Sequence, residues 1–308
     1  ARKAARTLVA ASFEERKSAL LAIATALESS VEEIVAANNQ DMERGKASGL
    51  NSQLLDRLML NEARIKAIAG GTRKVAALPN PLGNVLRKRT LDNGLELTQV
   101  TVPFGVVGMV YEARPNVTVD AAVILIMSGN ATLLRGSSSA EKSNEVLVSV
   151  MRRALSTTSI SPEVLQLIPS HDRDTTRALL HARGKVDLVI PRGSAALIRM
   201  VVDESTVPTI ETGAGVCHVY VDEKADLNKA LPILINSKTH RPSVCNAAET
   251  LLVHQKVKDE FLPKALRELH NAGVKLHGDE PTLAVARELH IPIEKAVEES
   301  WSTEYGVL

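Results

Sequence analysis

Residues 103–203 alternate short apolar runs with longer segments of helical periodicity, and this alternation limits the possible folds more than any other feature. A short apolar run between turn residues is typical of a buried strand. Repeated strand–helix units imply a mainly parallel sheet with helices on both faces. The strands expected are 106–111, 131–134, 164–168 and 186–190, and the helices expected are 117–127, 140–155, 175–182 and 194–203.

Three polar segments, residues 114–116, 135–137 and 192–194, each come directly after an expected strand. Ligand sites in such sheets lie beyond the carboxyl ends of the strands. We therefore expect the three segments to share one rim of the sheet.

The second and third segments suit a phosphate. Arg135 offers a forked set of donors and Ser137 adds a hydroxyl. Gly193 and Ser194 open an expected helix, where free N–H groups favour an anion. A solvated arginine and a plain helix cap are the alternatives, and for Ser194 alone the cap is the commoner role.

The first segment offers polar groups for a substrate. Asn116 could direct an amide donor at a developing oxyanion, or it could cap the following helix. Arg114 could bind a carboxylate or phosphate of a substrate. Its alternative is a surface ion pair with Glu112 or Asp120.

Cys245 lies between a basic loop, which contains Lys238 and Arg241, and an apolar run at residues 247–253. A strand rooted in a core can hold a loop thiol, and nearby cations favour the reactive thiolate. A lone cysteine is more often a buried structural residue. Asn246 instead indicates a turn at this position. Lys238 and Arg241 could also be ordinary solvated charges.

Glu211 precedes this loop, and a carboxylate beside a thioester would activate water. The usual dinucleotide fingerprint GxGxxG is missing from the sequence. The two cysteines form no CxxC pair, and the eight histidines show no metal-ligand spacing. The sequence therefore predicts no metal site.

Charge and composition argue against several classes of partner. The 37 Lys and Arg residues balance 36 Asp and Glu residues, so no net field attracts nucleic acid or an anionic membrane. One Trp, three Tyr and three Phe provide few surfaces for base stacking. No apolar run is long enough to span a bilayer. We expect a cytoplasmic protein with both thiols reduced.

Other patterns flank the alternating region. Helices are expected from Ser12, Val31 and Asn61, and the glycines at 70 and 71 should weaken the third. Residues 85–90 and 95–102 flank a turn and predict a hairpin. After residue 216, strands are expected at 217–221 and 248–254 and helices at 227–235 and 257–271, whereas 281–308 is weakly patterned.

Five motifs occur in the order expected of one family. They are VPFGVVGMVYEARPNVTVD, SGNATLLRGSS, DLVIPRGSAALIR, GVCHVYVDEKADL and KTHRPSVCNAAETLLVH. They closely resemble the γ-glutamyl phosphate reductase family, also called glutamate-5-semialdehyde dehydrogenases, a branch of the aldehyde dehydrogenase superfamily. The resemblance extends from about Ala1 to about Tyr305. Met127 and Gly136-Ser137 depart from that family, which usually has Lys and Gly-Gly there.

The resemblance implies NADPH-dependent reduction of L-glutamate 5-phosphate to glutamate 5-semialdehyde and phosphate, the second step of proline biosynthesis. It implies that Cys245 is the nucleophile, and we choose Asn116 as its oxyanion partner. In such a reaction Glu211 is not expected to act as a base. The residues assigned to the substrate are Arg114, Lys238, Arg241 and Asn246, and those assigned to the cofactor are Arg135, Ser137, Gly193, Ser194 and Glu304.

The implied fold is α/β and aldehyde dehydrogenase-like. Residues 1–84 and 103–215 would form the NADP-binding domain, 85–102 an oligomerisation hairpin, and 216–308 the catalytic domain. The family continues beyond residue 308, so the C-terminal part of that domain is expected to be missing. The implied partners are a second copy, as a dimer or tetramer, and glutamate 5-kinase.

Two other functions stay open at this point. The first is a thiol aldehyde dehydrogenase that oxidises a free aldehyde, with Glu211 as the hydrolytic base. The second is a catalytically inactive fragment that acts in assembly.

Overall fold

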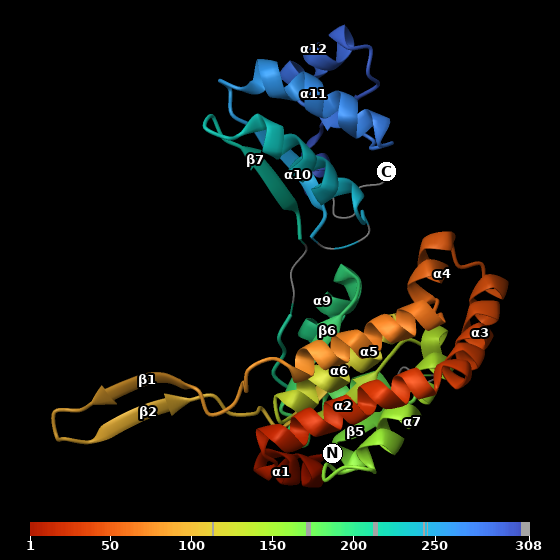
Figure 1. The fold of residues 1–308 in the computed structure, drawn as a ribbon, viewed down its shortest axis with the longest axis vertical. Coiled ribbons are helices and arrows are strands. Elements are labelled where there is room, and N and C mark those ends of the chain that lie inside the picture. The colour runs from red at the N-terminus through yellow and green to blue at the C-terminus, as the bar shows by residue number, and fades with distance from the viewer. Residues whose placement is uncertain (113, 171–173, 212–214, 243, 245, 303–308) are drawn as a thin grey trace. The chain divides into compact units, whose positions relative to one another are not determined.

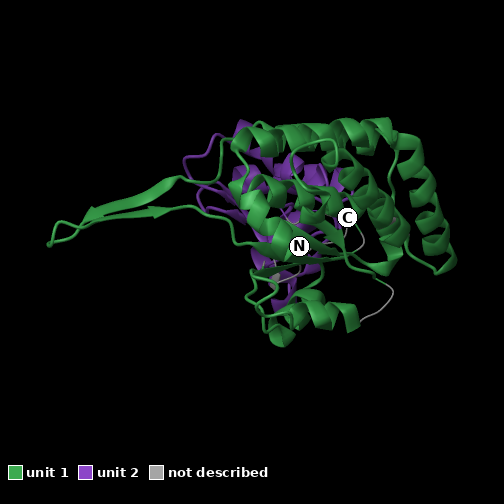
Figure 2. Ribbon diagram, turned by 90° about the horizontal axis from the view of Figure 1, so that it is seen from below, with its two compact units in different colours: residues 1–212 green, residues 213–308 purple. Residues whose placement is uncertain are grey.

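A computed structural model describes residues 1–112, 114–170, 174–211, 215–242, 244 and 246–302. The chain divides into two compact units, Ala1–Thr212 and Gly213–Leu308 (Figure 2). The roles assigned to the predicted domains stay predictions.

The first unit is built on a parallel sheet of four strands. These are β3 (Val106–Tyr111), β4 (Ala131–Arg135), β5 (Leu165–Leu167) and β6 (Leu188–Arg192), in the order β5-β4-β3-β6. The chain runs outward from β3 through β4 to β5, and β6 then pairs with the other side of β3. The strand order therefore reverses between β3 and β6, which is where open α/β sheets form ligand crevices.

Helices cover both faces of this sheet, as the alternating pattern predicts. The helices that follow the strands are α6 (Pro115–Met127), α7 (Glu141–Leu155), α8 (Asp174–Leu180) and α9 (Ala195–Glu204). Leu125 of α6 packs with Val107 and Leu188. Leu179 of α8 contacts the neighbouring Gly108, where an added Cβ would lie 3.1 Å from it. Adjacent strand residues face opposite sides, so α6 and α8 lie on opposite faces.

Five helices precede the sheet: α1 (Arg2–Ala10), α2 (Phe13–Ser29), α3 (Val31–Ala47), α4 (Ser52–Leu58) and α5 (Glu62–Ala76). The predicted capping box is present at Ser12 and Glu15, and Asn61 caps α5. The helix α5 continues through both of its glycines, because α2 and α6 pack along it (Figure 1). The short helices α1 and α4 are not evident from the sequence pattern.

The predicted hairpin forms from β1 (Val85–Thr90) and β2 (Glu96–Val100), which pair antiparallel. Gly94 provides the positive φ of 85° at the turn. Every residue of both strands is exposed, and the hairpin projects from its unit (Figure 1). Its role in oligomerisation stays a prediction.

The second unit contains a parallel pair, β7 (Cys217–Val221) and β8 (Ala248–Val253). Its helices are α10 (Leu227–Thr239), α11 (Lys258–Asn271) and α12 (Glu280–Glu288), and a minor pair joins β9 (His277–Gly278) to β10 (Glu294–Lys295). Val221, Leu234 and Phe261 form its main core. The helix α12 lies in the stretch that the sequence leaves weakly patterned.

Short 3-10 helices complete the described chain at η1 (Ser138–Ala140), η2 (Pro162–Val164) and η3 (Glu298–Ser302). Within the described ranges, every helix is too short or too polar to cross a membrane.

Candidate active site

The parallel register brings the three predicted polar segments to the carboxyl-terminal end of the sheet. Arg135, the last residue of β4, lies opposite Val110, and Arg192, the last residue of β6, lies opposite Tyr111. All three strands therefore end at the same level. Asn116, Ser137 and Ser194 follow these strand ends in the chain, at the rim that the sequence predicts.

A pocket of about 270 Å³ opens at this rim, within the first unit. It is lined by Val110, Tyr111, Glu112, Arg135, Ser137, Ser138, Ser170 and Leu197. Burial raises the pKa of Tyr111, and its hydroxyl is hydrogen-bonded to Thr118 Oγ1 at 2.7 Å. The lining therefore combines the cation of Arg135, the carboxylate of Glu112, several hydroxyl groups and a tyrosine that stays neutral.

Arg135 is held along the wall of the pocket by backbone carbonyls. Its guanidinium donates to the carbonyl of Gly136 at 3.0 Å and to that of Ser170 at 3.4 Å. Ser137 caps the following 3-10 helix by accepting from the N–H of Ser139 at 3.3 Å. Both predicted phosphate-binding side chains therefore border one cavity on a fixed backbone.

The N-terminus of α9 is already occupied by a carboxylate. Glu112 accepts hydrogen bonds from the N–H of Ser194 at 2.7 Å and from its hydroxyl at 2.8 Å. An added Cβ at Gly193 would lie 2.7 Å from Glu112 Oε2, so a larger residue there would force the Glu112 carboxylate to shift. The sequence predicts an anion at this terminus, and here the protein supplies one from the end of β3.

The capping interpretation of Ser194 also holds, because its hydroxyl accepts from the N–H of Leu197. The sequence predicts for Glu112 only an ion pair with Arg114. The two contacting residues are 82 positions apart, and no local spacing connects them.

Asn116 lies in the first turn of α6 and is not its N-cap. Arg114 holds that position, and its side chain makes no capping hydrogen bond. The Asn116 amide donates to Asp120 Oδ2 at 3.0 Å, one turn further along the helix. Desolvation raises the pKa of Asp120, and the hydrogen bond from Asn116 opposes that rise. Asp120, considered above as a partner for Arg114, binds Asn116.

In the second unit, Lys238 is paired with Glu249. Lys238 Nζ lies 2.8 Å from Glu249 Oε2, and the two side chains are 10% and 7% exposed. Lys238 is therefore not the solvated charge that the sequence left open, and its ammonium group is engaged by a carboxylate. The pair joins the end of α10 to β8, and its two residues precede and follow the predicted nucleophile in the sequence.

Of the other residues predicted from the sequence, some are exposed and others lie outside the described part of the chain. Arg241 and Asn246 are exposed at the surface of the second unit, and Glu211 is exposed at the end of the first. Cys245 and Glu304 lie outside the described residues. Among the residues that are described, no three His, Cys, Asp or Glu side chains are grouped to hold a metal ion.

Comparison with known proteins agrees with this geometry. A model of the aldehyde dehydrogenase family matches residues 1–286. The chain belongs to the aldehyde dehydrogenase family. The architecture and the rim described above are therefore those of an aldehyde dehydrogenase-like α/β protein.

Within this family, the most similar relatives carry one name. The chain is 53% identical over 305 residues to a gamma-glutamyl phosphate reductase of Thermobifida fusca, covering 99% of this chain and 72% of the relative. It is 51% identical over 306 residues to one from Moorella thermoacetica, with coverage of 99% and 72%. These relatives place the chain in the gamma-glutamyl phosphate reductase branch of the aldehyde dehydrogenase family.

Solved structures of that branch share the fold. The crystal structure of gamma-glutamyl phosphate reductase from Thermotoga maritima aligns with a TM-score of 0.90 at 42% identity, covering 100% of this chain and 73% of that one. The enzyme from Saccharomyces cerevisiae aligns with a TM-score of 0.63 at 32% identity, covering 94% and 73%.

Proposed function

We propose that this protein reduces L-glutamate 5-phosphate to L-glutamate 5-semialdehyde and phosphate, with NADPH as the reductant, in proline biosynthesis. The observation that carries the proposal is the 53% identity to a gamma-glutamyl phosphate reductase over 99% of the chain. Kinase and homo-oligomer partners stay predictions.

The pocket at the carboxyl ends of the strands suits part of a phosphate-bearing cofactor. Aldehyde dehydrogenases use a nicotinamide cofactor. Arg135 contributes a fixed cation, and Ser137 and Ser138 contribute polar groups, at the carboxyl end of β4, and α/β sheets take dinucleotides beyond the carboxyl ends of their strands. These residues would hold NADPH, which supplies a hydride to the acyl group when it is bound.

Cys245 would carry the acyl group. Its thiolate attacks the carbonyl carbon of the acyl phosphate, the carbon–sulfur bond forms, and the bond to phosphate breaks with release of inorganic phosphate. The thioester is then reduced to a thiohemiacetal. Collapse of that species releases the aldehyde and restores the thiolate.

Asn116 is the candidate donor to the oxyanion that forms during this attack. An amide nitrogen carries two N–H groups, and one hydrogen bond to Asp120 leaves the second for another acceptor. Arg114, Arg241 and Asn246 are the candidates for binding the substrate. Lys238, the fourth residue assigned to the substrate, forms an ion pair with Glu249 within the second unit.

Glu211 would be harmful as a strong base in this reaction, because water would hydrolyse the thioester before reduction. The competing function, oxidation of a free aldehyde, needs that hydrolysis. In the oxidative direction, the two functions therefore differ in the group that cleaves the thioester, phosphate in one and water in the other.

The test is NADPH formation in the reverse direction, from glutamate 5-semialdehyde and NADP⁺ with and without inorganic phosphate. We expect formation to depend on phosphate and to persist in Glu211→Gln. Equal rates without phosphate, together with loss of activity in Glu211→Gln, would instead establish the aldehyde-oxidising function.

A further inference from the structure

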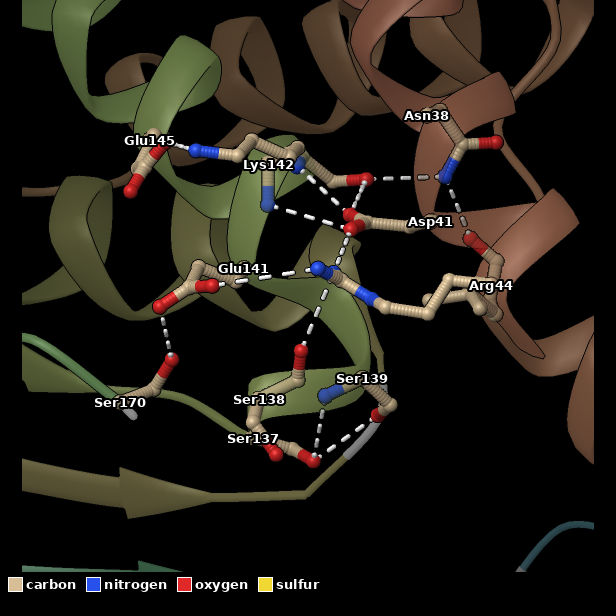
Figure 3. Close-up of polar contacts among 12 residues, drawn as sticks. Asn38, Asp41, Arg44, Ser137, Ser138, Ser139, Glu141, Lys142, Glu145 and Ser170 are labelled. Atoms are coloured by element: carbon tan, nitrogen blue, oxygen red, sulfur yellow. Dashed lines mark hydrogen bonds and ion pairs between the residues drawn. The ribbon is translucent and has the colours of Figure 1, made fainter. Parts of the chain in front are cut away.

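The helix α7, which follows the pocket loop, has no cap from its own sequence. Its N-cap residue is Ala140, which cannot supply a side-chain acceptor. Asp41 of α3 supplies one instead, accepting from the N–H groups of Lys142 at 3.2 Å and Ser143 at 2.8 Å. The carboxylate also accepts from the Ser143 hydroxyl at 2.7 Å. A distant helix therefore caps α7 (Figure 3).

Asp41 is completely buried, so its charge requires compensation. Arg44, one turn further along α3, provides it through an ion pair. Asn38, also buried, donates to Ser143 Oγ at 3.0 Å and to the Leu58 carbonyl at 2.9 Å. The polar face of α3 is therefore fixed by several hydrogen bonds at once.

Arg44 also extends to the pocket itself. Its guanidinium donates to the carbonyl of Ser138 at 3.2 Å and lies 3.9 Å from Glu141 Oε2. Glu141 in turn accepts from the hydroxyl of Ser170 at 3.2 Å. Ser138 and Ser170 both line the pocket, so Arg44 and Glu141 connect α3 to two of its walls (Figure 3).

We propose that Arg44, held by the buried Asp41, is a positioning residue for the cofactor pocket. It fixes the Ser138 carbonyl and the Glu141 carboxylate, and through them the two serine walls. The inference rests on the proposed function, in which this pocket takes part of NADPH. Arg44 touches no cofactor atom in this account and acts only through the loop.

The test compares Arg44→Met with Arg153→Met. Arg153 also joins α7 to α3, through an ion pair with Glu33 at 2.6 Å, but it does not contact the pocket loop. Arg44 and Arg153 are both about half exposed, but the partner of Arg44 is the buried Asp41, so Arg44→Met should lower the melting temperature whereas Arg153→Met should not. NADPH affinity is measured by titrating the fluorescence of NADPH, and the melting temperature of each protein is recorded alongside.

We expect Arg44→Met to raise the Kd for NADPH about tenfold, the effect of losing one charge-assisted hydrogen bond. Arg153→Met should leave Kd within about twofold of wild type, since its ion pair is exposed. Arg44→Lys should give an intermediate value, because it keeps the charge near Asp41 but lacks the forked donors.

Two results would overturn the inference while wild type binds NADPH. The first is an unchanged Kd in Arg44→Met, whether or not its melting temperature falls, and the second is an equal loss of affinity in Arg153→Met. Wild-type protein that binds no NADPH would overturn the proposed function, and the inference with it.

Discussion

Asp187, the residue before β6, shows how a single carboxylate can join three parts of the first unit. It pairs with Arg2 of α1 at 2.6 Å and accepts from the N–H of Val106, the first residue of β3, at 2.7 Å. Gly105 permits this contact, because an added Cβ there would lie 2.3 Å from Asp187 Oδ2. Burial alone would raise the pKa of Asp187, but the bonds from Arg2 and Val106 outweigh it and lower the pKa.

A lowered pKa makes the contribution of Asp187 depend on pH in a defined direction. The charged form stabilises the folded state above the ordinary pKa of about 3.9, and this is lost as the pH falls through the lower folded value. We expect Asp187→Asn to be less stable than wild type at pH 7, with a smaller difference at about pH 3. Urea unfolding at both pH values measures this, and an equal difference at both would contradict it.

At the same scale, the contacts that sequence analysis missed are pairs distant along the chain. Arg135, Ser137 and Ser194 could be assigned to one rim from the sequence, because each follows an expected apolar strand. The sequence did not place Glu112 on Ser194, 82 positions away, or Asp41 on Ser143, 102 positions away. Tertiary packing creates such pairs, and one sequence carries no local signal of them.

At the scale of elements, a buried ion pair joins α10 to β8, the two elements that precede and follow Cys245 in the sequence. Removing one partner of a buried pair leaves the other charge desolvated, so Lys238→Met should lower the free energy of unfolding of the second unit by about 3 kcal/mol. The double variant Lys238→Met with Glu249→Leu should recover much of that loss. Urea denaturation of each protein measures both effects.

A matched control lies in the same unit. Lys256 and Glu223 also form an ion pair, but Lys256 is 73% exposed. Lys256→Met should therefore change stability by less than about 1 kcal/mol. Equal losses in Lys238→Met and Lys256→Met would show that the buried pair contributes no more to stability than an exposed one.

The strands and long helices of this fold could be predicted because each has its own pattern. The run at β3 is apolar throughout, and α2 has its own capping box. The helices α1, α4 and α12 have seven to nine residues, so few turns are available to reveal a period. Isolated helices of that length are marginal, and tertiary packing stabilises them.

At the scale of the whole molecule, the proposed reaction requires the thiol of Cys245 to be far more reactive than that of Cys217. Cys217 is half-buried at the start of β7, beside an irregularity in the register of that strand pair. We predict that Cys245 has the more reactive thiol, because it follows Arg241 in a basic segment of the sequence and nearby cations favour the thiolate. Both cysteines lie in motifs of the γ-glutamyl phosphate reductases, but in the sequence only the motif of Cys245 places the basic residues Lys238 and Arg241 just before the thiol.

The most direct test is the rate of iodoacetamide alkylation at each cysteine, measured by peptide mass mapping in one reaction. We expect Cys245 to react far faster than Cys217 and NADPH or substrate to alter its rate. Equal, slow alkylation of both thiols, unaffected by either ligand, would contradict the assignment of Cys245 as the nucleophile.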